Sequence, residues 1–241
     1  MAEGRGRATR AHAAEPASGA ENGAPGGGAH GGTRGSARGS YAVGDARRRR
    51  ILDTAVEHFA RWGFHASSMA RIAHDCGITQ GGLLHHFRSK EDLLLHVLAQ
   101  SERHDVQQLF ATAPASVAEG FAALVRLAGA NTRRPGPVRM FNVLVGEAGN
   151  PGHPAHRYFR DRYARVLGHT ADLLEAGIAR GEIRPDLDVR ACAQEQIAVM
   201  DGLQLQWALD ESALDMPGRL REYLDRTLRH ITVDGSGLPA A

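Results

Sequence analysis

Residues 67–87 constrain the fold of this chain more than any other segment. They contain the pattern of a short helix, a tight turn around Gly77 and a second short helix that begins near Thr79. The first helix carries the small residue Ala73, which lets the second helix approach closely, and Gly77 stands where the backbone must leave helical angles. Ile78 supplies an apolar side chain for the corner. This layout is typical of a helix-turn-helix, whose second helix can lie in the major groove of DNA.

An amphipathic helix is expected on each side of this motif. Before it, a helix begins at Asp45, carries apolar residues at helical spacing after the basic run 47–50, and is expected to end at Gly63. We expect Ser67 to cap the helix that precedes Gly77, and Ser89 to cap the helix that follows the motif. Because the helix that begins at Asp45 would brace the motif, its arginines would lie near DNA phosphates.

Helical patterns continue through the rest of the chain. Breaks that contain Pro or Gly separate them, and no segment shows the sustained alternation of apolar and polar residues that marks a strand. The sequence therefore predicts an all-α fold, in which a three-helix helix-turn-helix domain precedes a larger helical domain. The helices expected in the larger domain cover residues 116–132, 137–148, 154–180, 189–209 and 217–231.

The positive charge of the chain is concentrated at its N-terminal end. The formal net charge is only +2, yet residues 1–50 hold nine Arg and four acidic residues. Residues 1–44 are rich in Gly and Arg and poor in apolar side chains, so they cannot bury enough surface to offset the entropy of ordering, and we expect a disordered tail. Two uses of this tail stay open: an inert linker, or an arm that binds DNA without sequence preference.

Composition and motifs argue against several other classes of protein. The sequence has no stretch of about 18 apolar residues, so we expect no membrane-spanning helix. The N-terminus lacks the apolar core of a secretion signal and two cysteines are too few for a disulfide scaffold, so we expect a cytoplasmic protein. The sequence contains neither a P-loop, nor a nucleophile elbow, nor a His-Glu-x-x-His motif. We therefore expect no enzymatic activity, no cofactor and no metal site.

A set of residues at fixed spacing runs through the segment 46–95. It comprises Ile51-Leu52-Asp53-Thr54-Ala55, Phe59, Gly63-Phe64, Ser67-Ser68-Met69, Ile72-Ala73, Gly77-Ile78-Thr79, Gly81 and His86-Phe87-Arg88-Ser89-Lys90-Glu91-Asp92-Leu93-Leu94. This set resembles the DNA-binding domain of the TetR family of bacterial transcriptional regulators. Beyond it the chain resembles the family in architecture, which implies a DNA-binding domain at 45–95, an effector-binding and dimerisation domain at 96–234 and a flexible C-terminus at 235–241.

The resemblance implies a set of DNA-binding residues. Gln80 would read a base edge and Thr79 a phosphate or a thymine methyl group, while Gly81 lets the backbone approach the DNA. Ser67 and Ser68 would hold a phosphate. With the arginines before them, the full set expected to bind DNA is Arg49, Arg50, Ser67, Ser68, Thr79, Gln80, Gly81, Leu84, His85, His86 and Lys90.

Two positions depart from the family's pattern. Leu84 stands where the family commonly has Tyr, so a tyrosine contact to phosphate is not possible there, and Gly82 stands where the family has a hydroxyl-bearing or larger residue. We therefore expect DNA contacts to depend more on His85 and on the arginines. Phe87 is expected in the core, and a structural role for His86 at the turn into the fourth helix is as well supported as a DNA contact.

The resemblance also implies an effector pocket and a dimer interface in the larger domain. The same residues can equally form its core, because a buried stripe looks alike in each case. The pocket residues expected are Phe110, Phe121, Leu124, Met140, Phe141, Leu144, Tyr158, Tyr163, Gln204 and Trp207. The interface residues expected are Met200, Leu203, Trp207, Leu220, Tyr223 and Leu224.

The sequence thus favours a homodimeric repressor that binds a pseudo-palindromic operator in double-stranded DNA and is released by a small-molecule effector. One alternative is a helix-turn-helix protein that acts without an effector. A second is a helical-bundle enzyme that contains the motif, although the sequence supplies no convergent acid and base groups at recognisable spacing.

Overall fold

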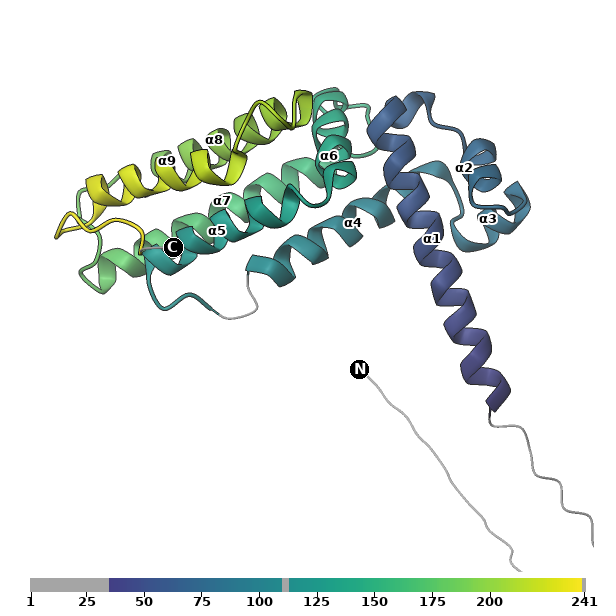
Figure 1. Cartoon of the computed structure of the whole chain (residues 1–241), viewed down its shortest axis with the longest axis horizontal. Coiled ribbons are helices and arrows are strands. Elements are labelled where there is room, and N and C mark those ends of the chain that lie inside the picture. Colours follow the sequence, from purple (N-terminus) through teal and green to yellow (C-terminus); the bar gives the residue numbers. More distant parts are fainter. Residues whose placement is uncertain (1–34, 110–112, 240–241) are drawn as a thin grey trace, which may run out of the picture.

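The computed structural model describes residues 35–109 and 113–239, which fold into helices joined by loops (Figure 1). Within these ranges an isolated bridge between Ile183 and Thr232 is the only β-type pairing, so the predicted all-α fold is confirmed. No helix there is both long and apolar enough to cross a membrane. The helices are α1 (Gly35–Ala66), α2 (Met69–Asp75), α3 (Gln80–His86), α4 (Lys90–Leu109), α5 (Val117–Asn131), α6 (Pro135–Glu147), α7 (His156–Ala179), α8 (Val189–Leu209) and α9 (Met216–Ile231).

The helices form two parts, a head and a body. The head consists of α1, α2, α3 and the first half of α4, while the body consists of α5, α7, α8 and α9, which run side by side (Figure 1). The second half of α4 lies along the body, and α6 stands between the body and α1. The predicted boundary at residue 95 therefore falls inside α4, a single helix that belongs to both parts.

The ends of the body helices lie close to those predicted, because capping residues fix them. Ser116, Asp188 and Asp215 each precede a helix and accept a hydrogen bond from a backbone N–H of its first turn, at 3.1, 2.9 and 3.0 Å. Pro135 starts α6, where the missing N–H of proline has no cost. Local signals of this kind can be read from sequence.

The first helix is longer than predicted at its N-terminal end. It begins at Gly35 instead of Asp45, and its first part projects away from the rest of the protein (Figure 1). The prediction relied on the lack of apolar residues, but a helix that is already nucleated can extend without a buried face. The rest of the predicted tail, residues 1–34, lies outside the described residues. At the other end Gly63 has a φ of 67°, which interrupts the helix as predicted.

Two clusters of buried side chains stabilise the head and the body. The cluster of the head includes Phe59 and Leu94, both fully buried, and it continues into α6 through Met140 and Leu144. The cluster of the body joins α5, α7, α8 and α9. Because the core of the head includes side chains of α6, the position of the head depends on that helix.

The C-terminal segment differs from the flexible end that we expected at 235–241. Residues 235–239 fold back against α9, where Leu238 is only 8% exposed and joins the core of the body. Its backbone N–H donates a hydrogen bond to the Asp225 carboxylate at 2.8 Å, and Arg221 donates one to the Pro239 carbonyl. A single apolar side chain with a place in the core is enough to hold this segment; residues 240–241 lie outside the described residues.

Candidate functional site

The turn between α2 and α3 has the geometry of a helix-turn-helix. Gly77 has a φ of 67°, in the left-handed region that favours glycine. The N–H of Ile78 donates to the carbonyl of Ala73 at 3.0 Å, and Cys76 lies beneath the turn with 3% of its surface exposed. The roles predicted for Ala73, Gly77 and Ile78 are confirmed.

Helix α3 has one buried face and one exposed face. Leu83 and Phe87 are fully buried in the head. Thr79 caps the helix, since its hydroxyl oxygen accepts a hydrogen bond from the N–H of Gly82 at 3.0 Å. The exposed residues form what we call the recognition face, which consists of Thr79, Gln80, Gly81, Leu84 and His85. The structure thus brings five of the residues expected to bind DNA together on one surface.

The arginines before Ile51 differ in what they can contact. Arg49 and Arg50 are exposed, as a contact to phosphate requires. Arg48 is half-buried, and its guanidinium lies 4.4 Å from the ring centroid of Phe87. Arg48 therefore braces α1 against the end of α3. Its position one helical turn before the core residue Leu52 is the sequence signal that separates it from its neighbours.

The two serines before α2 have different roles, and the predicted cap is wrong. Ser67 is 4% exposed, and its hydroxyl donates to the carbonyls of Gly63 and His58 at 2.6 and 3.2 Å. Ser68 is the N-cap residue, and its hydroxyl makes no capping hydrogen bond. Ser67 thus closes the bend after α1, whereas Ser68 is half-exposed at the start of α2.

Lys90 is bound to the backbone of the head. Its ammonium donates hydrogen bonds to the carbonyls of Phe64, Ser67 and His65 at 2.8, 3.0 and 3.2 Å. It also lies 4.3 Å from the ring centroid of Phe64. An ammonium has three N–H donors, so these contacts use all of them and fix the bend between α1 and α2.

His86 is half-buried at the end of α3. Burial lowers its pKa, and the neighbouring charges of His85, Arg47 and Arg48 lower it further. Both effects favour the neutral imidazole over the charged form. This supports the structural role that we considered beside a DNA contact.

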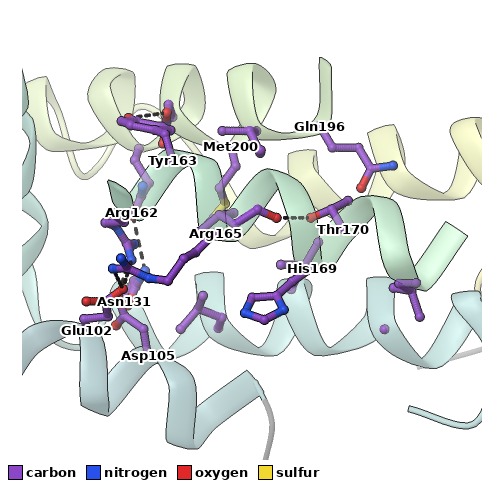
Figure 2. Close-up of a pocket in the computed structure, with 18 of the residues that line it drawn as sticks. Glu102, Asp105, Asn131, Arg162, Tyr163, Arg165, His169, Thr170, Gln196 and Met200 are labelled. Carbon is purple, nitrogen blue, oxygen red and sulfur yellow. Dashed lines mark hydrogen bonds and ion pairs between the residues drawn. The ribbon is translucent and has the colours of Figure 1, made fainter. Parts of the chain in front are cut away.

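A cavity of about 950 Å³ lies in the body between α4, α5, α6, α7 and α8 (Figure 2). Its volume lies in the range of pockets that hold small molecules. Five residues of the predicted pocket line it, namely Phe121, Leu124, Phe141, Tyr163 and Gln204. Met200, which we expected at a dimer interface, also lines it.

Four residues of the predicted pocket lie elsewhere. Met140 and Leu144 are buried in the core that joins α6 to the head, and Trp207 is buried in the core of the body. Tyr158 points its hydroxyl to the Leu98 carbonyl at 3.2 Å, outside the cavity lining. Helical spacing identified these side chains as buried but could not show which neighbour covers them. The remaining residue, Phe110, lies outside the described residues.

The polar end of the cavity is a network of charged residues that sequence reasoning missed (Figure 2). Glu102 of α4 accepts a hydrogen bond from Arg165 of α7 at 2.6 Å. Arg162 lies 3.8 Å from Glu102 and 3.6 Å from Asp105. Burial raises the pKa of Asp105, while for Glu102 the hydrogen bonds outweigh burial and lower the pKa. Charged residues stand three apart on each helix, 102 with 105 and 162 with 165, and this spacing is the sequence signal that could have identified the network.

Most of the predicted dimer interface is covered within the chain. Trp207, Leu220 and Leu224 are 3%, 1% and 0% exposed, so they stabilise the body itself. Leu203 and Tyr223 are half-buried against the same core. A different stripe of α8 is exposed, with Leu205 at 50% and Leu209 at 80%.

A helix-turn-helix head that shares α4 with a helical body containing a cavity is typical of the class of DNA-binding transcriptional regulators. Among the described residues, no group of His, Cys, Asp and Glu side chains is arranged to hold a metal ion. The profile of the tetR family of bacterial regulatory proteins matches residues 51–97, and that of the C-terminal domain of BetI-type transcriptional repressors matches residues 152–233.

The chain is also similar to individual transcriptional regulators. The chain is 32% identical over 150 residues to the HTH-type transcriptional repressor KstR2 of Mycobacterium tuberculosis, which covers 60% of this chain and 73% of that protein. It is 30% identical over 183 residues to the HTH-type transcriptional repressor Rv1474c of the same species, covering 75% and 90%. A transcriptional regulator from Saccharomonospora viridis, solved in complex with choline, is 25% identical with a TM-score of 0.62, covering 78% and 98%.

This protein belongs to the tetR family of bacterial regulatory proteins. The resemblance seen in residues 46–95 is thereby confirmed, and the chain is a DNA-binding transcriptional regulator of a family whose relatives are repressors.

We predict that Lys90→Met lowers the free energy of unfolding by about 1–2 kcal/mol, because three carbonyls lose a charged donor. Urea unfolding without DNA measures this. Arg88→Met is the matched control, since Arg88 is exposed and only its backbone N–H is hydrogen-bonded, to Asp92. A Lys90→Met protein of unchanged stability and weaker DNA binding would show instead that this lysine serves the DNA.

Proposed function

We propose that the protein is a homodimeric repressor that binds a pseudo-palindromic operator through α3 and is released from it by a small molecule in the cavity. Helix α4 is the observation that carries the proposal. Its first half is part of the head, where Leu93 and Leu94 are fully buried. Its second half supplies Glu102 and Asp105 to the cavity wall. If α4 can take two orientations, a ligand that binds one of them more tightly shifts the equilibrium toward it, and the head moves with the helix.

The recognition face supports sequence-specific DNA binding. Gln80 stands at the exposed start of α3, where the first residues of a recognition helix meet base edges. Arg49, Arg50 and Ser68 are exposed or half-exposed beside it and would hold phosphates. Two such heads in a dimer would meet successive major grooves, about 34 Å apart. Regulation of this kind acts on chromosomal DNA, and hence in the cytoplasm.

A stripe of small and apolar residues on α8 supports dimerisation. Ala198, Leu205 and Leu209 are exposed, and a side chain at Gly202 would meet open space. The spacing of these four residues places them along one side of the helix. Exposed apolar residues in a continuous stripe mark surfaces that bind another protein, and a second copy that lays its own α8 here would cover both stripes.

The cavity supports the effector, because it is large, mainly apolar and closed at one end by charged groups (Figure 2). The related regulator from Saccharomonospora viridis was solved with a small molecule, choline. A thermal-shift screen of metabolites against the full chain tests this half of the proposal. A repressor that binds its operator but is neither stabilised nor released by any metabolite would favour the effector-free alternative; we propose no catalytic role.

We predict that Gln80→Ala lowers the preference for the operator over unrelated DNA by about 1–3 kcal/mol, because a base contact is lost. Arg50→Ala should weaken binding to both DNAs and flatten the dependence of affinity on salt, because a phosphate contact is lost. Mobility shifts on the DNA that flanks the protein's own gene, against scrambled DNA at about 150 mM salt, measure both.

Exposed residues of the same types in the body, Gln206 and Arg126, provide matched controls. Gln206→Ala and Arg126→Ala should bind DNA as the wild type does. A wild-type protein with no preference for the flanking DNA over scrambled DNA would contradict the proposal.

We predict that Leu205→Glu weakens dimerisation by at least about 2 kcal/mol, because it buries a charge in the centre of the α8 stripe. Sedimentation velocity over a range of concentrations measures the change. Leu95→Glu is the control, since Leu95 is 43% exposed on α4 and lies outside the stripe. A Leu205→Glu protein that remains dimeric, beside a Leu95→Glu protein that dissociates, would move the interface away from α8.

A further inference from the structure

One hydrogen-bond acceptor in the cavity has no donor. Gln196 of α8 is 3% exposed and lines the cavity. Its amide nitrogen donates to the sulfur of Cys192 at 3.4 Å, while its Oε1 accepts no hydrogen bond from any described residue. Figure 2 shows the side chain extending from α8 into the cavity. A buried acceptor without a donor is costly, so a partner that supplies one would be bound at this point.

A second acceptor on the same helix is only partly satisfied. The Asp201 carboxylate lines the cavity and accepts a hydrogen bond from the Tyr163 hydroxyl at 2.7 Å. A carboxylate can accept about four hydrogen bonds, so it has room for a further donor. Asp201 lies five residues after Gln196, which corresponds to a rise of about 8 Å along the axis of α8.

The wall beside these two acceptors is mainly apolar. Ile197 and Met200 of α8 and Val166 and Leu173 of α7 line it. The polar residues His169 and Thr170 of α7 line it too, and the Thr170 hydroxyl donates to the Val166 carbonyl at 2.9 Å. The cavity therefore offers a long apolar surface with a hydrogen-bond acceptor at two separate points along it.

The charged end of the cavity disfavours a further negative charge. Two of its arginines already face carboxylates, since Arg165 is hydrogen-bonded to Glu102 and Arg162 lies between Glu102 and Asp105. Arg103 and Arg180 line the cavity as well, and Arg180 is hydrogen-bonded to Glu182. Burial raises the pKa of both Asp105 and Asp201, which reflects the cost of negative charge at this end. A ligand carboxylate would add another negative charge and would bring no donor for either acceptor.

We propose that the cavity takes an elongated, mostly apolar ligand that presents a hydroxyl or amine donor at two points, one to Gln196 Oε1 and one to the Asp201 carboxylate, and that it discriminates against carboxylates. The regulatory meaning of such a ligand rests on the proposed function, whereas its chemistry rests on the cavity alone. Gln196 is then a residue that determines specificity.

Three ten-carbon probes that differ only in their end groups test the ligand class on the full chain. These are 1,10-decanediol, 1,10-diaminodecane and decanedioate, titrated by calorimetry at pH 7.5. The diol or the diamine should bind at least about tenfold tighter than the dicarboxylate, since each end can make a hydrogen bond that the dicarboxylate cannot. The tighter of the two shows which donor the cavity prefers. Equal or tighter binding of decanedioate, or no binding of any probe, overturns the proposal.

Substitution of Gln196 tests the residue itself. Gln196→Leu should weaken the preferred probe about fivefold, since one hydrogen bond is lost, and should raise the melting temperature of the free protein, since an unsatisfied buried acceptor is removed. A merely structural glutamine would give the opposite change in melting temperature. Gln196→Met is a second variant of closer shape, and Gln206→Leu is the control, because the amide of Gln206 is exposed and donates to Gly202. Unchanged probe affinity in both folded Gln196 variants overturns the proposal.

Mobility shifts of the flanking DNA with the same probes separate the two proposals. A wild type that binds this DNA but none of the probes contradicts the ligand class and leaves the repressor function standing. A probe that binds as expected and does not release the DNA supports the ligand class and contradicts its role as an effector.

Discussion

The carboxylate of Glu102 is the group that ties α4, the helix shared by head and body, to α7. It accepts hydrogen bonds from Arg165 at 2.6 Å and from Tyr158 at 3.1 Å, which tie α4 to α7. A half-buried carboxylate is stable only with such partners, and these donors hold its pKa below the ordinary value in spite of burial. The other end of α4 is packed into the head through Leu94, so Glu102 and the head are joined by one continuous helix.

A second link joins the head to α6. The backbone N–H of Phe64 donates to the Glu147 carboxylate at 2.9 Å, and Gly63 leaves room for that carboxylate where any side chain would overlap it. The same helix lines the cavity through Phe141. Two helices, α4 and α6, therefore contact both the cavity and the head.

The sequence was sufficient where the signal is local. Gly77, Ile78 and the ends of the body helices depend on neighbours within a few residues, and the structure agrees with the prediction there. It was insufficient where the partner is distant in the chain: Trp207 and Leu224 belong to a stripe that looks the same whether its own chain or a second copy covers it. Ser67 and Lys90 are residue types that often bind phosphate. Here, however, both side chains donate hydrogen bonds to backbone carbonyls at the bend after α1. Glu102 was missed because a charged residue on a helix is solvated by default.

The proposed function requires that α4 transmits events in the cavity to the DNA-binding surface. The operator affinity of Glu102→Gln, measured by fluorescence anisotropy on the full chain, tests this most directly, because Glu102 lies in the body and far along α4 from the recognition face. We expect the variant to keep its fold and its preference for the operator but to bind it several-fold more weakly, at roughly 1 kcal/mol, in the range of an allosteric coupling energy. A folded Glu102→Gln protein with unchanged operator affinity would contradict transmission through α4.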